Sequence, residues 1–304
     1  MISEQQRPMV TRGAAYGLTA AAIWGGMYVV SDLVLVIIPP FTLLTIRLIL
    51  GAVVLGLLLW RTGRRLPPRA GVFKALAVGF VGFGISVGAQ FVGTDLSNAV
   101  NGALVTSASP AFILLFAALI LRERLTLRHM AAVALASIGV AVILDLAQAD
   151  FSSAAFSGNL VLVVAAVTWG LYSVLIRWAS GELDTLVMTF LGFLGGLLLT
   201  IPAALLELTQ RPIGTIDFAV FLGILYLGII STAGAMWLWN SAFALVDASI
   251  ASLFFFAQPL VGALLGALLG QAITMNLLAG GVLIALGVLL SLYRPRNPFP
   301  SRQS

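Results

Sequence analysis

The feature that most restricts how this chain can fold is the length of its uncharged segments. No charged side chain occurs between Asp217 and Asp247, and none occurs between Asp247 and Arg294. A helix needs about 20 apolar residues to cross the hydrocarbon core of a bilayer, and both stretches exceed that length. With 61% hydrophobic and 9% charged residues, the chain also has too little polar surface to coat a water-soluble globule. Because strand-like alternation is absent, we expect an all-α polytopic membrane protein.

Charged and turn-forming residues divide the chain into ten predicted transmembrane helices. The segments between them are short, so no room remains for a soluble catalytic domain. The predicted helices cover approximately residues 14–36, 40–60, 72–93, 98–120, 127–146, 158–179, 185–206, 218–243, 248–269 and 275–293.

The distribution of basic residues predicts the orientation of these helices. Of the 16 Lys and Arg residues, all except Arg47 and Arg211 fall near the chain ends or in and beside alternate loops that share one side of the membrane. Basic residues accumulate on the cytoplasmic side of membrane proteins. We therefore expect a multi-pass protein of the bacterial inner (plasma) membrane with both termini cytoplasmic. The excess of basic residues then requires no nucleic-acid partner.

The sequence contains an internal repeat. The stretch SASPAFILLFAALILRERLT, which ends at Thr126, resembles FAQPLVGALLGALLGQAIT, which ends at Thr274. Gly139 and Gly287 are separated by the same offset as these two threonines. One repeat unit contains five predicted helices, and because five is odd, the second unit must enter the bilayer from the opposite side.

The predicted architecture is therefore ten transmembrane helices in two inverted five-helix repeats around a central cavity. The first repeat covers residues 1–146 and the second covers residues 147–304. Inverted repeats are the usual architecture of proteins that work by alternating access. Transporter is thus the leading class before any family is considered.

Two prolines occupy corresponding positions in the repeats. Pro110 and Pro259 each remove a backbone amide and crowd the carbonyl four residues earlier, that of Thr106 or Phe255. We expect them to kink the fourth and ninth helices near mid-membrane. They act either as hinges that bend during transport or as static kinks.

Several of these features together resemble a known family. Ten predicted helices, a Trp-Gly pair within the first and sixth helices, an arginine early in the second, and the pattern SP…LRERLT…G resemble the EamA family of the drug/metabolite transporter superfamily. Within it, the chain is most similar to the bacterial aromatic amino-acid exporters. The second repeat departs from the pattern, with Gln271 where Glu123 stands in the first. We expect Glu123 and Thr126 to lie at the cytoplasmic surface, where a polar side chain can cap the fifth helix.

Polar and aromatic residues at membrane depth are costly unless they face a cavity or a partner. A mid-membrane pocket with aromatic walls and neutral amides suits a flat, apolar molecule with few charges. The alternative for each residue is helix packing through amide hydrogen bonds and aromatic contacts, and Trp237 could also belong to an interfacial belt. The candidate substrate-binding residues are Trp24, Tyr28, Arg47, Gln90, Asn101, Trp169, Tyr172, Trp237, Asn240, Phe254 and Gln258.

Arg47 is the one basic residue clearly within a predicted span. It lies seven residues after Pro40, about 10 Å below the outer end of its helix. Its side chain could extend outward to the membrane surface, or it could pair with Asp32 or Asp95. The third hypothesis is that it attracts a carboxylate group of the substrate.

The remaining sequence features restrict the mechanism. There is no GxxxxGK[ST] phosphate loop and no HExxH metal motif, and the sole histidine, His129, lies at the predicted cytoplasmic start of the fifth helix. We expect a transporter that exports small, mainly aromatic, amino acids or related aromatic metabolites, with no enzymatic activity, cofactor or metal. Its partners would be the small-molecule substrate and the lipid bilayer, and it would act as a monomer. The alternatives are an exporter of cationic aromatic drugs and a lipid flippase.

Overall fold

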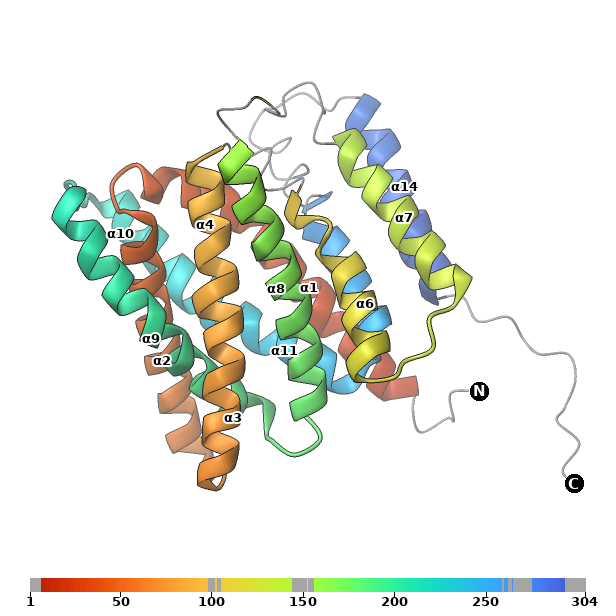
Figure 1. Cartoon of the computed structure of the whole chain (residues 1–304), viewed down its shortest axis with the longest axis horizontal. Coiled ribbons are helices and arrows are strands. Elements are labelled where there is room, and N and C mark those ends of the chain that lie inside the picture. The colour runs from red at the N-terminus through yellow and green to blue at the C-terminus, as the bar shows by residue number, and fades with distance from the viewer. Residues whose placement is uncertain are drawn as a thin grey trace, which may run out of the picture.

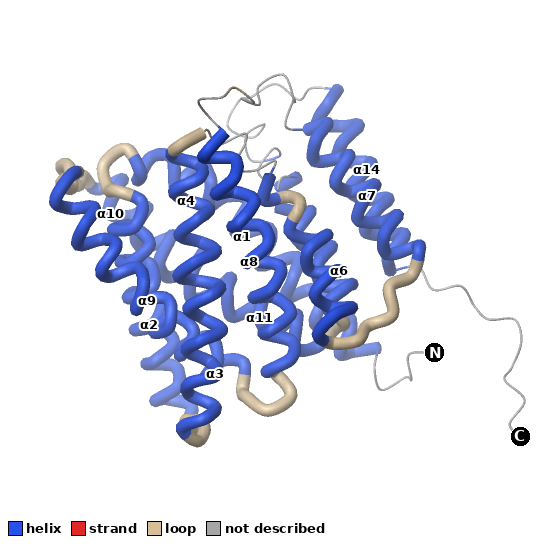
Figure 2. Tube along the Cα trace, viewed as in Figure 1, coloured by secondary structure: helices blue, strands red, loops and turns tan. Residues whose placement is uncertain are grey.

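The computed structural model describes residues 7–97, 105–143, 156–258 and 275–292, with residues 102, 152, 260–261 and 264 between them. Every regular element in these residues is helical (Figures 1 and 2). The α-helices are α1 (Arg7–Leu35), α2 (Pro40–Thr62), α3 (Arg69–Gly79), α4 (Val87–Asp95), α6 (Ser109–Ile120), α7 (Leu127–Ile143), α8 (Phe156–Ala179), α9 (Thr185–Gln210), α10 (Phe218–Leu225), α11 (Ala235–Leu245), α12 (Ala248–Ala251) and α14 (Met275–Leu292).

Within the described residues, three short segments interrupt regular α-helical geometry inside the spans. The π-helical segment η1 (Phe80–Ser86) joins α3 to α4, and the π-helical segment η3 (Tyr226–Gly234) joins α10 to α11. The 3₁₀ segment η4 (Ser252–Phe256) follows α12. Each segment changes the direction in which the side chains beyond it point, because its number of residues per turn differs from the 3.6 of an α-helix.

Five of the described helical stretches are long and apolar enough to cross a membrane. They are Pro40–Thr62, Arg69–Asp95, Phe156–Ala179, Thr185–Gln210 and Phe218–Leu245. They coincide with the second, third, sixth, seventh and eighth predicted helices. Shorter apolar helices lie within the fourth, fifth and tenth predicted helices. The prediction of an all-α polytopic membrane protein is confirmed.

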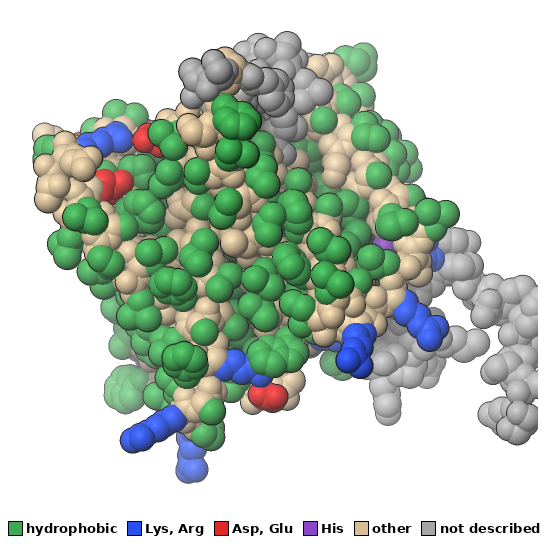
Figure 3. Space-filling view, viewed as in Figure 1, with side chains coloured by type: hydrophobic (Ala, Val, Ile, Leu, Met, Phe, Trp, Pro, Cys, Tyr) green, Lys and Arg blue, Asp and Glu red, His purple; other side chains and the backbone are tan. Residues whose placement is uncertain are grey.

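Side-chain charge divides the molecular surface into bands. Figure 3 shows hydrophobic side chains over the middle of the visible face and basic side chains gathered along its lower edge. That edge includes the loops at residues 62–69 and 121–126, which carry Arg64, Arg65 and Arg124. We call it the basic end, and the end formed by residues 36–39 and 211–217 the opposite end.

The helix packing has the exchange symmetry that two inverted repeats require. Helices at corresponding positions in the two repeats, α2 with α9 and α7 with α14, pack against each other at the two edges of the bundle (Figure 1). The contact of α1 with α11 has its counterpart in the contact of α8 with α4. Both edge pairs are antiparallel. The start of α2 meets Glu207 near the end of α9, and Gly139 late in α7 meets Gly280 early in α14.

The repeat-related glycines Gly139 and Gly287 explain how α7 and α14 pack closely. A Cβ atom at Gly139 would lie 2.7 Å from the carbonyl oxygen of Gly280, and one at Gly287 would lie 2.7 Å from that of Ala132. Both distances are too short for a real side chain. Small residues let membrane helices approach backbone to backbone, where dispersion contacts rather than the hydrophobic effect hold them together.

Two glutamates stabilise the first turns of helices far away in sequence. At the opposite end, Glu207 accepts hydrogen bonds from Phe41 N (3.1 Å), Thr42 N (2.8 Å) and Thr42 Oγ1 (3.0 Å) at the start of α2. At the basic end, Glu123 accepts hydrogen bonds from Ala248 N (2.9 Å) and Ser249 N (3.1 Å) at the start of α12. A carboxylate placed there satisfies free amides and interacts favourably with the helix dipole.

The prediction that Glu123 caps the fifth helix is therefore wrong, and the one for Thr126 is confirmed. Thr126 Oγ1 accepts a hydrogen bond from His129 N in the first turn of α7. Glu123 instead reaches the start of α12. The two carboxylates each join helices of different repeats, and sequence spacing gives no signal of such contacts.

Replacing Glu207 with alanine is expected to lower the free energy of unfolding by about 1–2 kcal/mol, because two amides at the start of α2 lose their acceptor. The midpoint of thermal unfolding in detergent measures the effect. Glu182→Ala is the matched control, because this glutamate pairs with Lys74 on an exposed surface, where such pairs contribute little. Equal losses in the two variants would contradict the capping role.

Candidate functional site

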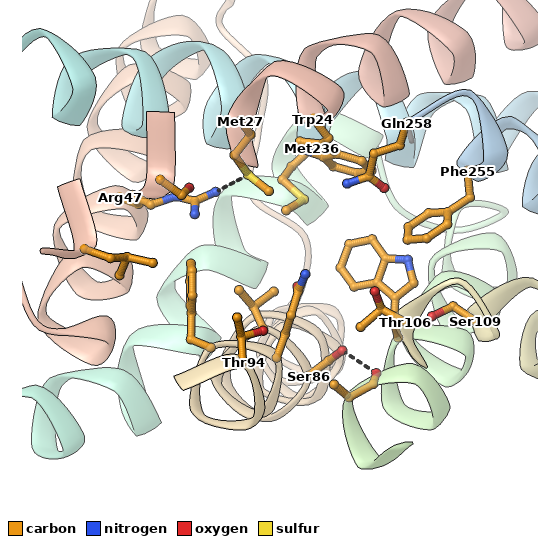
Figure 4. A pocket seen from close by; sticks show the side chains of 17 residues that line it. Trp24, Met27, Arg47, Ser86, Thr94, Thr106, Ser109, Met236, Phe255 and Gln258 are labelled. Carbon is orange, nitrogen blue, oxygen red and sulfur yellow. Dashed lines mark hydrogen bonds between the residues drawn. The ribbon is translucent and has the colours of Figure 1, made fainter. Parts of the chain in front are cut away.

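A pocket lies inside the bundle between helices of both repeats (Figure 4). It encloses about 870 Å³, counting its open mouth. Among the described residues, the pocket is lined by Trp24, Met27, Ser31, Leu35, Arg47, Ser86, Val87, Gln90, Phe91, Thr94, Thr106, Ser109, Ala165, Trp169, Met236, Phe255 and Gln258.

Helical periodicity explains how α1 contributes four lining residues. Trp24, Met27, Ser31 and Leu35 are three to four residues apart, so they form one stripe along the helix. The stripe runs from mid-span toward the opposite end, where α1 ends at Leu35. The pocket therefore extends from the middle of the bundle toward the opposite end.

The end of η1 and the helix α4 that follows it supply the facing wall. Ser86, Gln90 and Thr94 recur every four residues and place three polar side chains along the pocket. Ser86 Oγ donates a hydrogen bond to the carbonyl oxygen of Ala165 on α8 (2.9 Å), which ties this wall to the second repeat. The facing walls combine an apolar, sulfur-containing stripe from α1 with a polar stripe from α4.

Arg47 on α2 brings the one positive charge among the described lining residues. Its side chain is 2% exposed. Its Nε donates to Thr232 Oγ1 at 3.0 Å, its Nη2 lies 3.3 Å from Met27 Sδ, and its guanidinium carbon is 5.7 Å from the ring centroid of Phe91. All these partners are uncharged, and Nη1 has no hydrogen-bond partner within the described residues.

The π-helical segment η3 orients Thr232, the hydrogen-bond partner of Arg47. Thr232 Oγ1 donates to the carbonyl oxygen of Leu227, five residues earlier, at 2.7 Å. The hydroxyl proton is thereby engaged, which leaves the oxygen lone pair free to accept from Arg47 Nε. The widened turn of η3 thus helps to fix the direction of the guanidinium group.

One of the three hypotheses for Arg47 can now be judged in full, and a second can be judged in part. A side chain that is 2% exposed does not extend to the membrane surface, so that alternative is wrong. Asp95 lies 4.0 Å from Arg211 and is not paired with Arg47. The side chain of Asp32 lies outside the described residues. The carboxylate-binding hypothesis stays a prediction, and Nη1, without a partner within the described residues, gives it a geometric basis.

Aromatic rings form the other end of the pocket. Trp24 packs edge-on against Trp169, with ring centroids 5.8 Å apart, and lies 5.3 Å from Trp239. Trp24 Nε1 donates to the carbonyl oxygen of Ser231 at 3.0 Å. Figure 4 shows Phe255 and Ser109 on the side of the pocket away from Arg47. Phe91 lies beside the charge of Arg47, whereas Phe255 lies on the other side of the pocket.

Two polar atoms at this aromatic end have no hydrogen-bond partner within the described residues. They are Trp169 Nε1 and Ser109 Oγ, on side chains that are 8% and 1% exposed. Leaving a buried donor unpaired costs about 1–3 kcal/mol, so such atoms mark places where a ligand can gain affinity. The unpartnered Ser31 Oγ on α1 is a further example.

The structure brings five predicted site residues together. Trp24, Arg47, Gln90, Trp169 and Gln258 all line the pocket, although they come from five different helical spans. The side chain of Tyr28 and all of Asn101 lie outside the described residues. The remaining four predicted residues have other contacts.

Tyr172 and Asn240 form a packing network instead of a pocket wall. Tyr172 Oη donates to Asn240 Oδ1 at 2.9 Å, and Asn240 Nδ2 donates to Thr189 Oγ1 at 2.9 Å. All three side chains are fully buried. The network joins α8, α11 and α9, which corresponds to the packing alternative considered for these residues.

Trp237 and Phe254 are also directed away from the pocket. Trp237 packs against Tyr16, with ring centroids 6.1 Å apart, and Phe254 packs on Gly17 of α1. Phe255, the neighbour of Phe254, lines the pocket, and Trp239, two residues after Trp237, is fully buried against Trp24. A shift of one or two positions changes the direction of a helical side chain by about 100° or 200°. That phase depends on η3 and η4, which hydropathy does not reveal.

Sequence reasoning also missed several lining residues with short side chains or sulfur. Met27, Ser31, Ser109 and Met236 line the pocket without being predicted to do so. The spacing of Met27 and Ser31 from Trp24 was a usable signal, because a helix face repeats every three to four residues. Ser109 gave no such signal, since the helix is interrupted just before it.

Pro110 lies in the first turn of α6, after a turn at residues 107–108. Near this point, Ala108 N and Ala111 N bond to carbonyls three residues earlier, at 3.1 Å and 3.0 Å. The fourth predicted helix is therefore divided at Pro110, and α6 begins where the proline costs no hydrogen bond. Bending during transport stays a prediction, and Pro259 lies outside the described residues.

The chemistry available to the pocket is recognition through charge, aromatic surface and hydroxyl groups. Among the described residues, no Asp or Glu lines it, and no group of three or more His, Cys, Asp or Glu could hold a metal ion. The described lining offers one cation, several hydroxyls and two amides.

Comparison with known proteins identifies relatives along nearly the whole chain. A sequence profile described as the EamA-like transporter family matches residues 11–145 and 156–293. The "Uncharacterized transporter YetK" of Bacillus subtilis (strain 168) is 24% identical over 292 residues, which cover 94% of this chain and 88% of the relative. "Protein PecM" of Dickeya dadantii (strain 3937) is 26% identical over 273 residues, with 88% of each chain covered.

A solved structure supports the fold independently. It superposes with a TM-score of 0.82 at 23% sequence identity, and covers 92% of this chain and 98% of that chain. At this level of identity, the likeness concerns the fold alone.

Proposed function

The chain belongs to the EamA-like transporter family, and from that premise we propose that it exports small aromatic solutes that carry a carboxylate group, aromatic amino acids or related metabolites, through the pocket between its repeats. Relatives named as uncharacterized transporters support transport as the activity.

The observation that carries the proposal is Arg47 Nη1, which has no hydrogen-bond partner within the described residues. A buried guanidinium without an anionic partner among the described residues is costly, and a bound carboxylate would offset that cost. A planar guanidinium also matches a carboxylate in geometry. At the other end, the rings of Trp24, Trp169 and Phe255 provide contact surface for an aromatic side chain.

Exchange between two conformations would move the solute across the membrane. The antiparallel pairing of α2 with α9 and of α7 with α14 supports an alternating-access cycle, because exchanging the conformations of inverted halves exchanges the open side. In the predicted orientation, the basic end faces the cytoplasm, and the pocket described here extends toward the outside.

A cationic aromatic drug fits this pocket less well. Arg47 would repel it, and no carboxylate lines the described pocket to attract it. No observation on the described residues favours a lipid flippase.

Transport by the purified protein in liposomes tests the proposal. We expect saturable uptake of labelled tryptophan or phenylalanine, inhibited by other aromatic amino acids more than by a polar amino acid or a cationic aromatic drug. Protein-free liposomes are the control. Uptake of the cationic drug without uptake of any aromatic carboxylate would contradict the proposal.

A further inference from the structure

We propose that this pocket selects aromatic carboxylates that lack an α-ammonium group over the corresponding zwitterionic amino acids. This inference rests on the proposed function, and it names the substrate class more closely. The comparison that defines it is 3-phenylpropionate against phenylalanine, which differ by one ammonium group.

The described lining of the pocket carries a positive charge. Arg47 is the one ionised residue among the described lining residues, and its contacts are with Thr232, Met27 and Phe91. The site therefore has a formal charge of +1 within the described residues. A monoanion neutralises that charge, whereas a zwitterion leaves it in place.

The ammonium group of a bound α-amino acid would lie close to this positive charge. In an α-amino acid, the ammonium and the carboxylate are attached to the same carbon atom. If the carboxylate binds Arg47 Nη1, the ammonium must lie close to the guanidinium. Arg47 is 2% exposed, so water screens this repulsion poorly.

The described residues beside Arg47 offer few hydrogen-bond acceptors to an ammonium group. Thr232 Oγ1 already accepts from Arg47 Nε and donates to Leu227 O. Ser31 Oγ has no hydrogen-bond partner within the described residues and can accept one ammonium proton, but as a neutral group it does not offset the charge. An ammonium group has three protons to satisfy, and the described surroundings of Arg47 offer no anion.

Aromatic rings can also hold a cation, by cation–π attraction. The Phe91 ring is already near the guanidinium, at 5.7 Å. Figure 4 shows Phe255 on the far side of the pocket from Arg47. An ammonium group on the carbon that bears the carboxylate stays on the Arg47 side of the pocket, so we expect the aromatic end to bind the ring of the solute.

Calorimetric titration of the purified protein in detergent at pH 7.5 tests the inference without any mutation. The ligands are 3-phenylpropionate, phenylalanine and phenethylamine, which has the ammonium and lacks the carboxylate. We expect 3-phenylpropionate to bind about tenfold or more tightly than phenylalanine, because like charges at short range in a buried site are strongly repulsive. Phenethylamine is expected to show no saturable binding.

Three controls separate recognition from partitioning into the micelle. Protein-free micelles measure partitioning directly, and in Arg47→Gln the preference for 3-phenylpropionate is expected to fall below about threefold, because no cation is left to favour the anion. Arg61→Gln, which changes an exposed arginine at the other end of α2, should keep the wild-type preference.

Failure of the inference and failure of the proposed function give different results. Phenylalanine binding as tightly as 3-phenylpropionate, or more tightly, would overturn the inference while transport of aromatic amino acids stood. An unchanged preference in Arg47→Gln would overturn it as well. If no aromatic carboxylate bound and none were transported, the proposed function would fail together with the inference.

Discussion

Replacing Arg47 with glutamine is expected to reduce transport of carboxylate-bearing aromatic solutes by about 100-fold or more, because truncating one partner of a buried charged pair typically costs about 2–5 kcal/mol. The glutamine can still bond to Thr232, but it has no charge to attract a carboxylate. The measurement is the initial rate of uptake per folded protein in liposomes. Arg47→Lys should retain part of the activity, because it keeps the charge and loses the planar fork.

The same substitution is expected to leave thermal stability unchanged or to raise it. A buried cation without an anionic partner destabilises the folded state, so Arg47→Gln should unfold at the same temperature as the wild type or a higher one. Lower transport together with unchanged or raised stability is the signature of a binding residue. Lower transport with a large loss of stability would show that Arg47 acts mainly in packing. Arg61→Gln is the matched control for removal of an arginine from α2.

Replacing Gly79 with alanine is expected to destabilise the bundle by about 3 kcal/mol or more, at or beyond the upper end of overpacking effects. A Cβ atom at Gly79 on α3 would overlap the carbonyl oxygen and Cα of Gly192 on α9. A backbone cannot rotate away as a flexible side chain can, so the two helices must separate. Gly195 has the same relation to the carbonyl of Leu76, so the overlap occurs at two points of one helix crossing.

Thermal unfolding in detergent, followed by the fraction that remains monodisperse, measures the effect at Gly79. Gly234→Ala is the control within a span, because a Cβ atom there meets only the carbonyl oxygen of Ile229, at 3.6 Å. Gly181→Ala is the control in a loop, where nothing lies within 4 Å. Similar stability of the three variants would contradict the close packing of α3 on α9.

The spans were predictable because crossing a bilayer depends on local properties. A run of apolar residues long enough to cross, bounded by charges, identifies a helix without reference to any other part of the chain. Thus the predicted helix 40–60 corresponds to Pro40–Thr62, and 185–206 corresponds to Thr185–Gln210. Gly139 and Gly287 were paired by sequence and prove to occupy symmetric contacts.

The direction of individual side chains was only partly predictable. Trp24 and Trp169 line the pocket, whereas Trp237 faces Tyr16, and Trp239, two residues later, packs against Trp24. An uninterrupted helix can be followed at 100° per residue, but a π-helical or 3₁₀ segment shifts that phase for every residue after it. The shift is stabilised by contacts with other helices, so the sequence of one helix does not contain it.

The sequence by itself determined the class of this protein, its helical spans and its internal repeat, because hydropathy and self-similarity are properties of consecutive residues. Tertiary structure alone decided which residues meet. It placed Glu123 on α12, Glu207 on α2 and Arg47 beside Thr232, over separations of more than a hundred residues. Their partners are set by how the two repeats pack, and packing depends on the whole set of helix surfaces at once.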